Sequence, residues 1–315
     1  MTALEGRNIS VRYPGTPKGS RPAVRDVSLH VPMAGAVGLV GESGSGKSTV
    51  ARALVGLLSL DKGEILVEGR SLRGIDRRVQ MVFQDPFSSL NPRMSVGESI
   101  AEAIQRRHGQ RAARVRRTRD LLDLVSLDPS LVEVLPSQLS GGQRQRVAIA
   151  RALAAEPLVL IADEITSSLD VSAQALILNL LRRLREQLGL SLLLVSHNLA
   201  VVRYCTDSVS VMYRGGVIES GGSDDVLARP EHPYTQELIR SIPGSRRNSA
   251  LSDGPLKQPE PVDQALGVCG GCDYADRCPL PAAKEIRCRT MDPREGAHLR
   301  RHFSACFLSP MESQT

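Results

Sequence analysis

The chain has no tryptophan, and aromatic residues make up only 3% of its 315 residues. Its core must therefore rest mainly on aliphatic side chains, within a hydrophobic fraction of 41%. Long apolar runs are also missing: stretches such as 158–162 and 190–195 fall far short of the roughly 20 residues that a membrane-spanning helix needs. The sequence therefore predicts no segment that crosses a membrane.

A strong excess of one charge is lacking as well. Forty Lys and Arg against 34 Asp and Glu leave a net charge of +6, which is too mild to indicate a nucleic-acid partner. The start of the chain, MTALEGRNIS, lacks the basic and apolar parts of a signal peptide, so we expect a protein that is not exported. Five of the six cysteines lie between 269 and 306, which in a reducing compartment favours metal binding over disulfides.

Short β-rich runs that end at Gly or Pro predict strands at 9–13, 24–31, 36–40 and 64–67. The Arg-rich segment 95–134 has helical spacing. Further along, apolar strands at 158–162 and 191–196 flank a helix at 173–188. This alternation indicates an α/β protein whose sheet is connected by crossover helices.

A phosphate-binding loop is the clearest motif. Residues 41–49 read GESGSGKST, which fits G-x-x-x-x-G-K-S/T and lies between a predicted strand and a predicted helix. Glycines let backbone N–H groups face a phosphate chain, Lys47 reaches the outer phosphates, and the Ser48 hydroxyl can ligate Mg²⁺. The candidate nucleotide-binding residues here are Gly41, Ser43, Gly44, Ser45, Gly46, Lys47, Ser48 and Thr49.

Two acids follow the apolar strand at 158–162. Asp163 can hold the Mg²⁺ shell, and Glu164 can orient and polarise an attacking water, as phosphoryl transfer to water requires. Together with the upstream loop, they predict a nucleoside triphosphatase.

A third motif, LSGGQRQR at 139–146, opens a helix with Ser140, Gly141, Gly142 and Gln143. This is a second anion cradle, and one chain has no obvious use for two cradles on the same nucleotide. Here the chain resembles the ATP-binding cassette (ABC) family over residues 4–240. In that family the second cradle closes over ATP held by the opposite subunit, so the resemblance implies a dimer of ATPase subunits with two composite sites.

The same resemblance assigns further roles. Gln84 matches the glutamine that senses Mg²⁺ and the attacking water, His197 matches the histidine that contacts the γ-phosphate, and 167–170 matches the loop that contacts the other subunit. Tyr13 is the candidate for stacking on adenine, with a tyrosine packed on the core as the alternative. Ile165 stands where the family usually has Pro, which puts the local turn in question.

The fold implied is an α/β P-loop NTPase core of the ABC ATPase type, with a mixed sheet, crossover helices, an inserted helical subdomain and a small Cys-containing C-terminal extension. We place the core at 1–84 and 137–228, the helical subdomain at 85–136 and the extension at 229–315.

Two stretches, DPFSSLNP at 85–92 and RPEHPYTQEL at 229–238, resemble the oligopeptide and dipeptide import ATPases. The implied function is ATP hydrolysis at the cytoplasmic face of the membrane for an importer of oligopeptides or dipeptides, in which ATP-driven dimerisation is coupled to translocation. Its partners would be a second ATPase subunit, two transmembrane permease subunits and, indirectly, an extracytoplasmic substrate-binding protein. The alternatives are import of nickel or another small solute, or a soluble ABC ATPase of DNA repair or translation.

The cysteine-rich tail resembles the C-terminal extension of those peptide ATPases. The resemblance implies a four-iron four-sulfur (4Fe-4S) cluster on Cys272, Cys278, Cys288 and Cys306. Thiolates suit zinc equally, Cys269 and Cys272 have the spacing of a zinc-type pair, and unligated thiols are the third possibility. The expected cofactors are therefore ATP, Mg²⁺, and either the iron-sulfur cluster or Zn²⁺.

Overall fold

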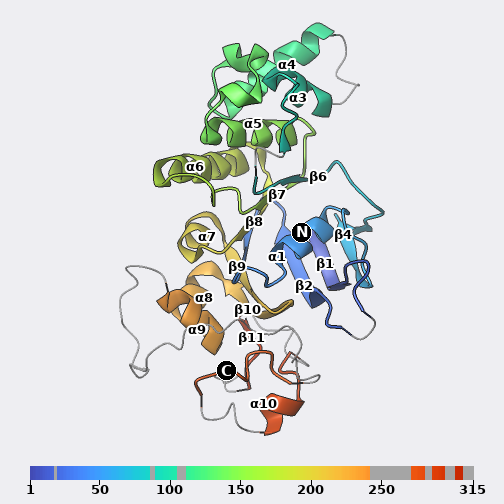
Figure 1. Cartoon of the computed structure of the whole chain (residues 1–315), viewed down its shortest axis with the longest axis vertical. Helices are drawn as coiled ribbons and strands as arrows, with labels where there is room; N and C mark the ends of the chain where they lie inside the picture. Colours follow the sequence, from blue (N-terminus) through green and yellow to red (C-terminus); the bar gives the residue numbers. More distant parts are fainter. Residues whose placement is uncertain are drawn as a thin grey trace.

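The computed structural model describes residues 1–17, 20–85, 89–104, 111–241, 271–280, 286–294 and 302–307. The molecule is elongated, with helices gathered at one end and the C-terminal segments at the other (Figure 1). Among the helices that the structure describes, none combines the length and the apolar character needed to cross a membrane.

The main sheet is mixed, as predicted. Within the described residues its strand order is β11-β10-β9-β3-β8-β7-β6. The strands from β9 to β6 run parallel, whereas β10 pairs antiparallel with both β9 and β11. The bounds are β3 Ala36–Val40, β6 Val79–Val82, β7 Val159–Asp163, β8 Ser191–Ser196, β9 Ser208–Tyr213, β10 Gly216–Gly222 and β11 Phe303–Ser304.

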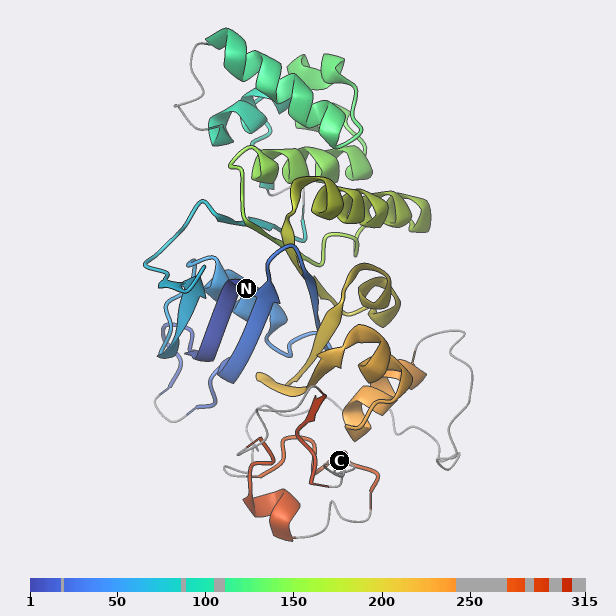
Figure 2. The ribbon, with the colours of Figure 1, turned by 180° about the vertical axis from the view of Figure 1, so that it is seen from behind.

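A smaller antiparallel sheet stands beside it, with the order β2-β1-β4-β5 (Figure 2). Its strands are β1 Thr2–Val11, β2 Val24–Pro32, β4 Lys62–Val67 and β5 Arg70–Ser71. β1 begins at Thr2 rather than at the predicted residue 9, and it ends at Val11, so Tyr13 lies in the loop that follows. Register shifts along β1 interrupt the alternation of apolar and polar residues, which explains why its first half was not predicted.

The core lies where β3, β7 and β8 pack side by side. Every residue of these three strands is buried, and parallel strands covered on both faces read as continuous aliphatic runs. This burial holds the carboxyl ends of the strands in fixed positions. The helices along the sheet are α1 Lys47–Leu54, α5 Gly141–Leu153, α6 Val171–Leu188, α7 Leu199–Cys205, α8 Ser223–Ala228 and α9 Pro233–Arg240.

Helices α3 Val96–Ala103 and α4 Arg111–Leu124 and the 3₁₀ turns Pro129–Glu133 and Pro136–Gln138 gather with α5 at one end of the molecule (Figure 1). Ser95 begins α3 with a capping box: its hydroxyl accepts from the Glu98 N–H, and the Glu98 carboxylate accepts from the Ser95 N–H. This helical region agrees with the predicted helical spacing. The exact domain boundaries at 84, 136 and 228 stay a prediction.

The described tail segments, including α10 Ile286–Thr290, lie at the opposite end. β11 joins the main sheet, with Ser304 opposite Glu219 and Phe303 opposite Ser220. The side chain of His302 lies 2.7 Å from the carboxylate of Glu219, which is fully buried. The tail is therefore attached to the edge of the sheet.

Candidate functional site

Three neighbouring parallel strands bring the predicted site residues together. The phosphate loop follows β3, Asp163 ends β7 and Glu164 comes next, and His197 follows β8. Because β3, β8 and β7 are adjacent, their carboxyl ends meet at one edge of the sheet, which is where ligands bind in open α/β sheets.

The backbone of the phosphate loop requires glycine at two close approaches. Gly41 has φ 153°, and a Cβ there would lie 2.2 Å from the Met212 carbonyl oxygen. Gly46 has φ 103°, and a Cβ there would lie 2.7 Å from the Ala23 carbonyl oxygen. The loop thus passes against two other chain segments, which fixes its shape before any ligand arrives.

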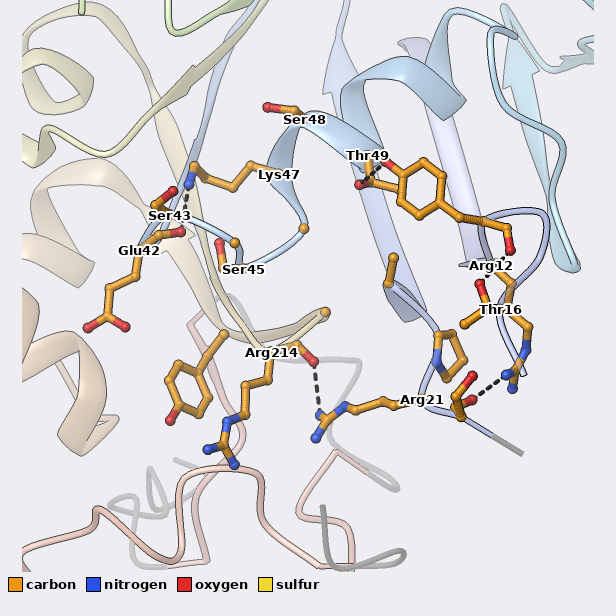
Figure 3. A pocket seen from close by; sticks show the side chains of 18 of the residues that line it. Arg12, Thr16, Arg21, Glu42, Ser43, Ser45, Lys47, Ser48, Thr49 and Arg214 are labelled. Carbon is orange, nitrogen blue, oxygen red and sulfur yellow. Dashed lines mark hydrogen bonds between the residues drawn. The ribbon is translucent and has the colours of Figure 1, made fainter. Parts of the chain in front are cut away.

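Lys47 is 4% exposed and points back across the loop (Figure 3). Its Nζ donates to the carbonyl oxygens of Gly41 and Glu42, both at 2.8 Å, and lies 3.8 Å from Glu164 Oε1. Burial lowers the pKa of Lys47, against the opposing effect of the nearby Glu164 and Asp163 carboxylates and of Glu42. A phosphate bound beside Nζ would stabilise the charge of the Lys47 ammonium, which burial has separated from water.

Ser48 and Asp163 form a pair of oxygen donors. The Ser48 hydroxyl donates to Asp163 Oδ1 at 3.0 Å, and Asp163 is 3% exposed. Burial raises the pKa of Asp163, although the hydrogen bond from Ser48 acts in the opposite direction. A desolvated carboxylate next to a hydroxyl suits a hard divalent cation such as Mg²⁺, so the two residues fit the predicted metal role.

Glu164 adopts a left-handed backbone conformation with φ 48°, and its N–H donates to the Val195 carbonyl oxygen at 3.0 Å. Its Oε2 lies 3.5 Å from His197 Nδ1. The turn that follows closes with Ile165 buried, where the ABC family usually has Pro, and with the Ser167 N–H donating to the Glu164 carbonyl. The departure at Ile165 therefore leaves the two acids at the strand end.

Gln84 follows β6 and reaches the same edge. Its Nε2 lies 3.4 Å from the Ser167 hydroxyl, which in turn donates to the Glu164 carbonyl oxygen at 2.9 Å. Asp170 ends this turn and caps α6 by accepting from the Ala173 N–H. The predicted Gln84 and the loop 167–170 are thus linked through one hydroxyl.

Tyr13 lies in the loop after β1 and is 42% exposed, so it is not the core-packed tyrosine of the alternative interpretation. Its hydroxyl is 2.9 Å from Thr49 Oγ1 (Figure 3). Tyr13 and the phosphate loop line one cavity of about 930 Å³. Residues that sequence reasoning did not identify also line this cavity, namely Arg12, Thr16, Ser20, Arg21, Pro22, Ala23, Glu42, Tyr213, Arg214, Gly215 and Arg277.

The second anion cradle does not reach this cavity within one chain. Ser140 caps α5 in a capping box with Gln143: its hydroxyl accepts from the Gln143 N–H at 3.2 Å, and Gln143 Oε1 accepts from the Ser140 N–H at 2.8 Å. Ser140, Gly141, Gly142 and Gln143 are absent from the cavity lining. Their function as a cradle across subunits therefore stays a prediction.

Four cysteines of the tail face one small pocket, although they come from separate tail segments. Cys272, Cys278, Cys288 and Cys306 line it, and no disulfide joins them. Burial raises the pKa of Cys272 to about 11. Within the described residues, no three His, Cys, Asp or Glu side chains form a group that could hold a metal ion, and Cys269 lies outside those residues.

Comparison with protein families gives two matches. The "ABC transporter" family model matches residues 24–167, and the model for "Oligopeptide/dipeptide transporter, C-terminal region" matches residues 218–285. A putative peptide import ATP-binding protein of Brucella ovis is 41% identical over 294 residues, which cover 89% of this chain and 90% of the relative. A probable peptide ABC transporter ATP-binding protein of Sinorhizobium fredii is 41% identical over 303 residues, covering 88% and 85%.

Solved structures show the same architecture. The ATP-binding cassette MJ0796, a dimer in a post-hydrolysis state with ADP and Pi, aligns with a TM-score of 0.63 and 28% identity over 70% of this chain and 98% of that one. CbiO1 from Clostridium perfringens, part of an ABC transporter complex, aligns with a TM-score of 0.65 and 26% identity, covering 76% and 93%.

Proposed function

The chain belongs to the ABC transporter family, in its oligopeptide/dipeptide branch, and we propose that it is the ATP-hydrolysing subunit of a peptide importer. Sequence identity of 41% to proteins named for peptide import, over nearly the whole chain, is the observation that carries this proposal. The match of 218–285 to the C-terminal region of oligopeptide/dipeptide transporters supports the substrate class, because that region lies outside the nucleotide motifs.

In the proposed site, the phosphate-loop N–H groups and Lys47 bind the phosphate chain of ATP, and Tyr13 stacks on adenine. Ser48, Asp163 and Gln84 would hold Mg²⁺, which supplies charge neutralisation between the outer phosphates when bound. The Ser48 hydroxyl oxygen and Asp163 Oδ1 lie 3.0 Å apart, and this pairing of two oxygen ligands supports the assignment.

Glu164 is the proposed base. A water held by its carboxylate attacks the γ-phosphorus, the bond between that phosphorus and the ADP oxygen breaks, and Glu164 takes the proton of the water. His197 lies 3.5 Å from the same carboxylate and would contact the transferred phosphoryl group. The two side chains thus hold the attacking and the transferred groups side by side.

We propose that Ser140, Gly141, Gly142 and Gln143 complete the site of a second ATPase subunit, since they cap a helix outside the cavity of their own chain. The dimeric state of MJ0796 with ADP and Pi supports such pairing. Closure of two subunits over ATP would move the helical end of each one against separate transmembrane permease subunits. We therefore propose that this chain acts at the cytoplasmic face of the membrane.

Reconstitution with the permease subunits that copurify with the full chain tests this function. We expect ATP hydrolysis in proteoliposomes to rise when a peptide-loaded binding protein is added, and Glu164→Gln should abolish the rise. Stimulation by nickel or another small solute, with no response to di- or oligopeptides, would replace the substrate class. Copurification with ribosomes or DNA instead of permeases would overturn the importer itself.

For the tail, the family implies an iron-sulfur cluster, and we propose that Cys272, Cys278, Cys288 and Cys306 hold it in a structural role. Four soft thiol ligands around one pocket fit this group.

Anaerobic purification of the full chain tests the cluster. We expect brown protein with about four irons and four sulfides per chain, and loss of colour in Cys278→Ser. Cys205→Ser is the matched control, because Cys205 is a buried thiol on α7, away from the tail. Colourless protein with one zinc would replace the cluster, and metal-free protein with the same tail structure would eliminate both metals.

A further inference from the structure

The region between the tail and the phosphate loop concentrates aromatic side chains. Of the five tyrosines in the chain, Tyr213 at the end of β9, Tyr234 on α9 and Tyr274 in the tail pack together. Their ring centroids lie 4.6 Å (Tyr213–Tyr234), 5.5 Å (Tyr213–Tyr274) and 5.8 Å (Tyr234–Tyr274) apart. Tyr234 belongs to the RPEHPYTQEL stretch at 229–238, which the nucleotide site described so far does not use.

Tyr234 is fully buried, and its hydroxyl accepts a hydrogen bond from the Glu42 N–H of the phosphate loop at 2.9 Å. Its position is set by the start of α9, where His232 Nδ1 accepts from the Tyr234 N–H at 3.1 Å. The backbone N–H of His232 in turn donates to the buried carboxylate of Glu219 at 3.0 Å. A fixed helix start therefore aims this hydroxyl at the loop.

Arg277 of the tail approaches the same loop residue from another side. Its guanidinium lies 2.8 Å from Glu237 Oε1 on α9 and 3.5 Å from Glu42 Oε2. The Tyr274 hydroxyl donates to the other oxygen of Glu237. Burial alone would lower the pKa of Arg277, but Glu237, Tyr213 and Glu42 hold it above the ordinary value. The side chain is therefore a fixed cation at the wall of the nucleotide cavity.

Glu42 is held at each of its polar groups. Its N–H bonds to Tyr234, its carboxylate faces Arg277, and its carbonyl oxygen accepts from Lys47 Nζ at 2.8 Å. A displacement of Glu42 would move one of the two carbonyls that orient the Lys47 ammonium. Glu42 therefore connects α9 and the tail to the Lys47 ammonium, which is proposed to bind the phosphates.

We propose that Tyr234, Glu237 and Arg277 form a brace that positions Glu42 and, through it, Lys47. The C-terminal extension is then part of the ATP site rather than an appendage to it. The three residues of the brace are positioning residues, since none of them lies among the groups assigned to the reacting atoms. Loss of the brace should therefore weaken ATP binding and leave turnover at saturating ATP nearly unchanged. This inference rests on the proposed ATP site.

Tyr234→Phe is the sharpest test, because it removes the hydroxyl and keeps the buried ring. We expect the Kd of a fluorescent (mant) ATP for the full chain, and the KM for ATP, to rise about threefold to tenfold, the loss typical of one hydrogen bond. The kcat should stay within about twofold. Tyr204→Phe is the matched control, since it removes a hydroxyl that donates to Asn179 on α6 and that does not line the nucleotide cavity, and it should change neither value.

Arg277→Gln provides a second, independent variant in case Tyr234→Phe folds poorly. Its control is Arg289→Gln, which removes one charge of the tail at an exposed position. We expect Arg277→Gln to raise the KM for ATP about threefold, which is less than for Tyr234→Phe because the ion pair between Arg277 and Glu42 is partly solvated. Arg277→Lys should restore the KM. In Glu42→Gln, the further change Arg277→Gln should have no added effect on the KM if the two residues act through each other.

Lys47→Ala, measured alongside, separates two kinds of failure. If Lys47→Ala loses ATP binding while Tyr234→Phe and Arg277→Gln bind ATP like the unsubstituted chain, the brace is refuted and the ATP site stands. If Lys47→Ala also binds normally, the ATP site itself is misplaced. A fall in kcat with no change in KM for the brace variants would likewise refute a positioning role.

Discussion

Glu164→Gln isolates the chemistry of the proposed base from the shape of the site. Glutamine has nearly the shape of glutamate, and the backbone bond from residue 164 to the Val195 carbonyl is retained. What disappears is the negative charge 3.8 Å from Lys47 Nζ and 3.5 Å from His197 Nδ1, together with the capacity to take a proton from water. Folding and nucleotide entry should therefore survive the change.

Two magnitudes decide the outcome. A positioned general base typically contributes about 10²- to 10⁴-fold to the rate, which corresponds to about 2.7–5.5 kcal/mol of barrier. At 3.8 Å and an effective dielectric constant of about 20, the attraction between Glu164 and Lys47 is about 4 kcal/mol before desolvation is subtracted. Removing that attraction frees the Lys47 ammonium for the phosphates. ATP affinity should therefore be equal or higher, while turnover falls at least about a hundredfold.

The assay compares phosphate release and mant-ATP binding by the full chain in the same buffer. Size-exclusion chromatography with ATP and Mg²⁺ should show more dimer for Glu164→Gln, because ATP that is not hydrolysed holds the two subunits closed. Glu68→Gln is the matched control, since it removes an exposed carboxylate paired with Arg78. Turnover within about fivefold of the unsubstituted chain would remove Glu164 from the role of base, because a positioned general base typically contributes at least about a hundredfold.

Two further predictions concern contacts between parts of the chain. If the subunit pairs with itself, mixing Lys47→Ala chains with Ser140→Ala chains should restore ATP turnover, because each mixed dimer then holds one intact composite site. Mixed dimers without turnover would contradict either the action of Ser140 on the partner's site or the self-pairing of the subunit. The hydrogen bond to Glu219 raises the pKa of His302 in the folded chain. The His302–Glu219 contact therefore stabilises the fold fully below about pH 6.5, and this stabilisation is lost as the pH rises through the folded-state pKa of His302. Denaturant unfolding at about pH 6 and about pH 9 should show a smaller pH dependence for His302→Gln, and equal dependence in both chains would refute the contribution.

The residues of the proposed nucleotide site could be named from the sequence because the chemistry expected of them is local. A phosphate loop needs glycine, lysine and a hydroxyl at fixed spacing, and Gly41 and Gly46 show why, since any side chain there would collide with a carbonyl. Asp163 and Glu164 follow an aliphatic strand, which places them at the sheet edge by topology alone. The crossover helices and the helical region followed from strand and helix patterns, whereas the mixed sheet followed from the resemblance to the ABC family.

The hairpin of β9 and β10 and the brace were not predicted, for a different physical reason. β9 and the first half of β10 are buried, but their sequence mixes Val, Ile and Tyr with serines and glycines, so it lacks the continuous aliphatic run that marks β7 and β8. The brace depends on Arg277 meeting Glu42 across 235 positions of sequence. No spacing rule connects residues so far apart, because their meeting is set by where the tail docks on the sheet.

In the proposed dimer, the brace and the second cradle of one chain belong to different composite sites, and this allows a final prediction. Each chain would contribute its phosphate loop to one site and Ser140 to the other. In a mixed dimer of Lys47→Ala and Ser140→Ala chains, the intact site therefore uses the phosphate loop of the Ser140→Ala chain.

Adding Tyr234→Phe to the Ser140→Ala chain should raise the KM for ATP of the mixed dimer, because the brace then fails beside the phosphate loop that still works. Adding it to the Lys47→Ala chain should have no effect, since the loop it positions is already inactive. Both mixtures carry the same three substitutions, so a general loss of stability would affect them equally. Equal KM values in the two mixtures would show that Tyr234 does not act on the phosphate loop of its own chain.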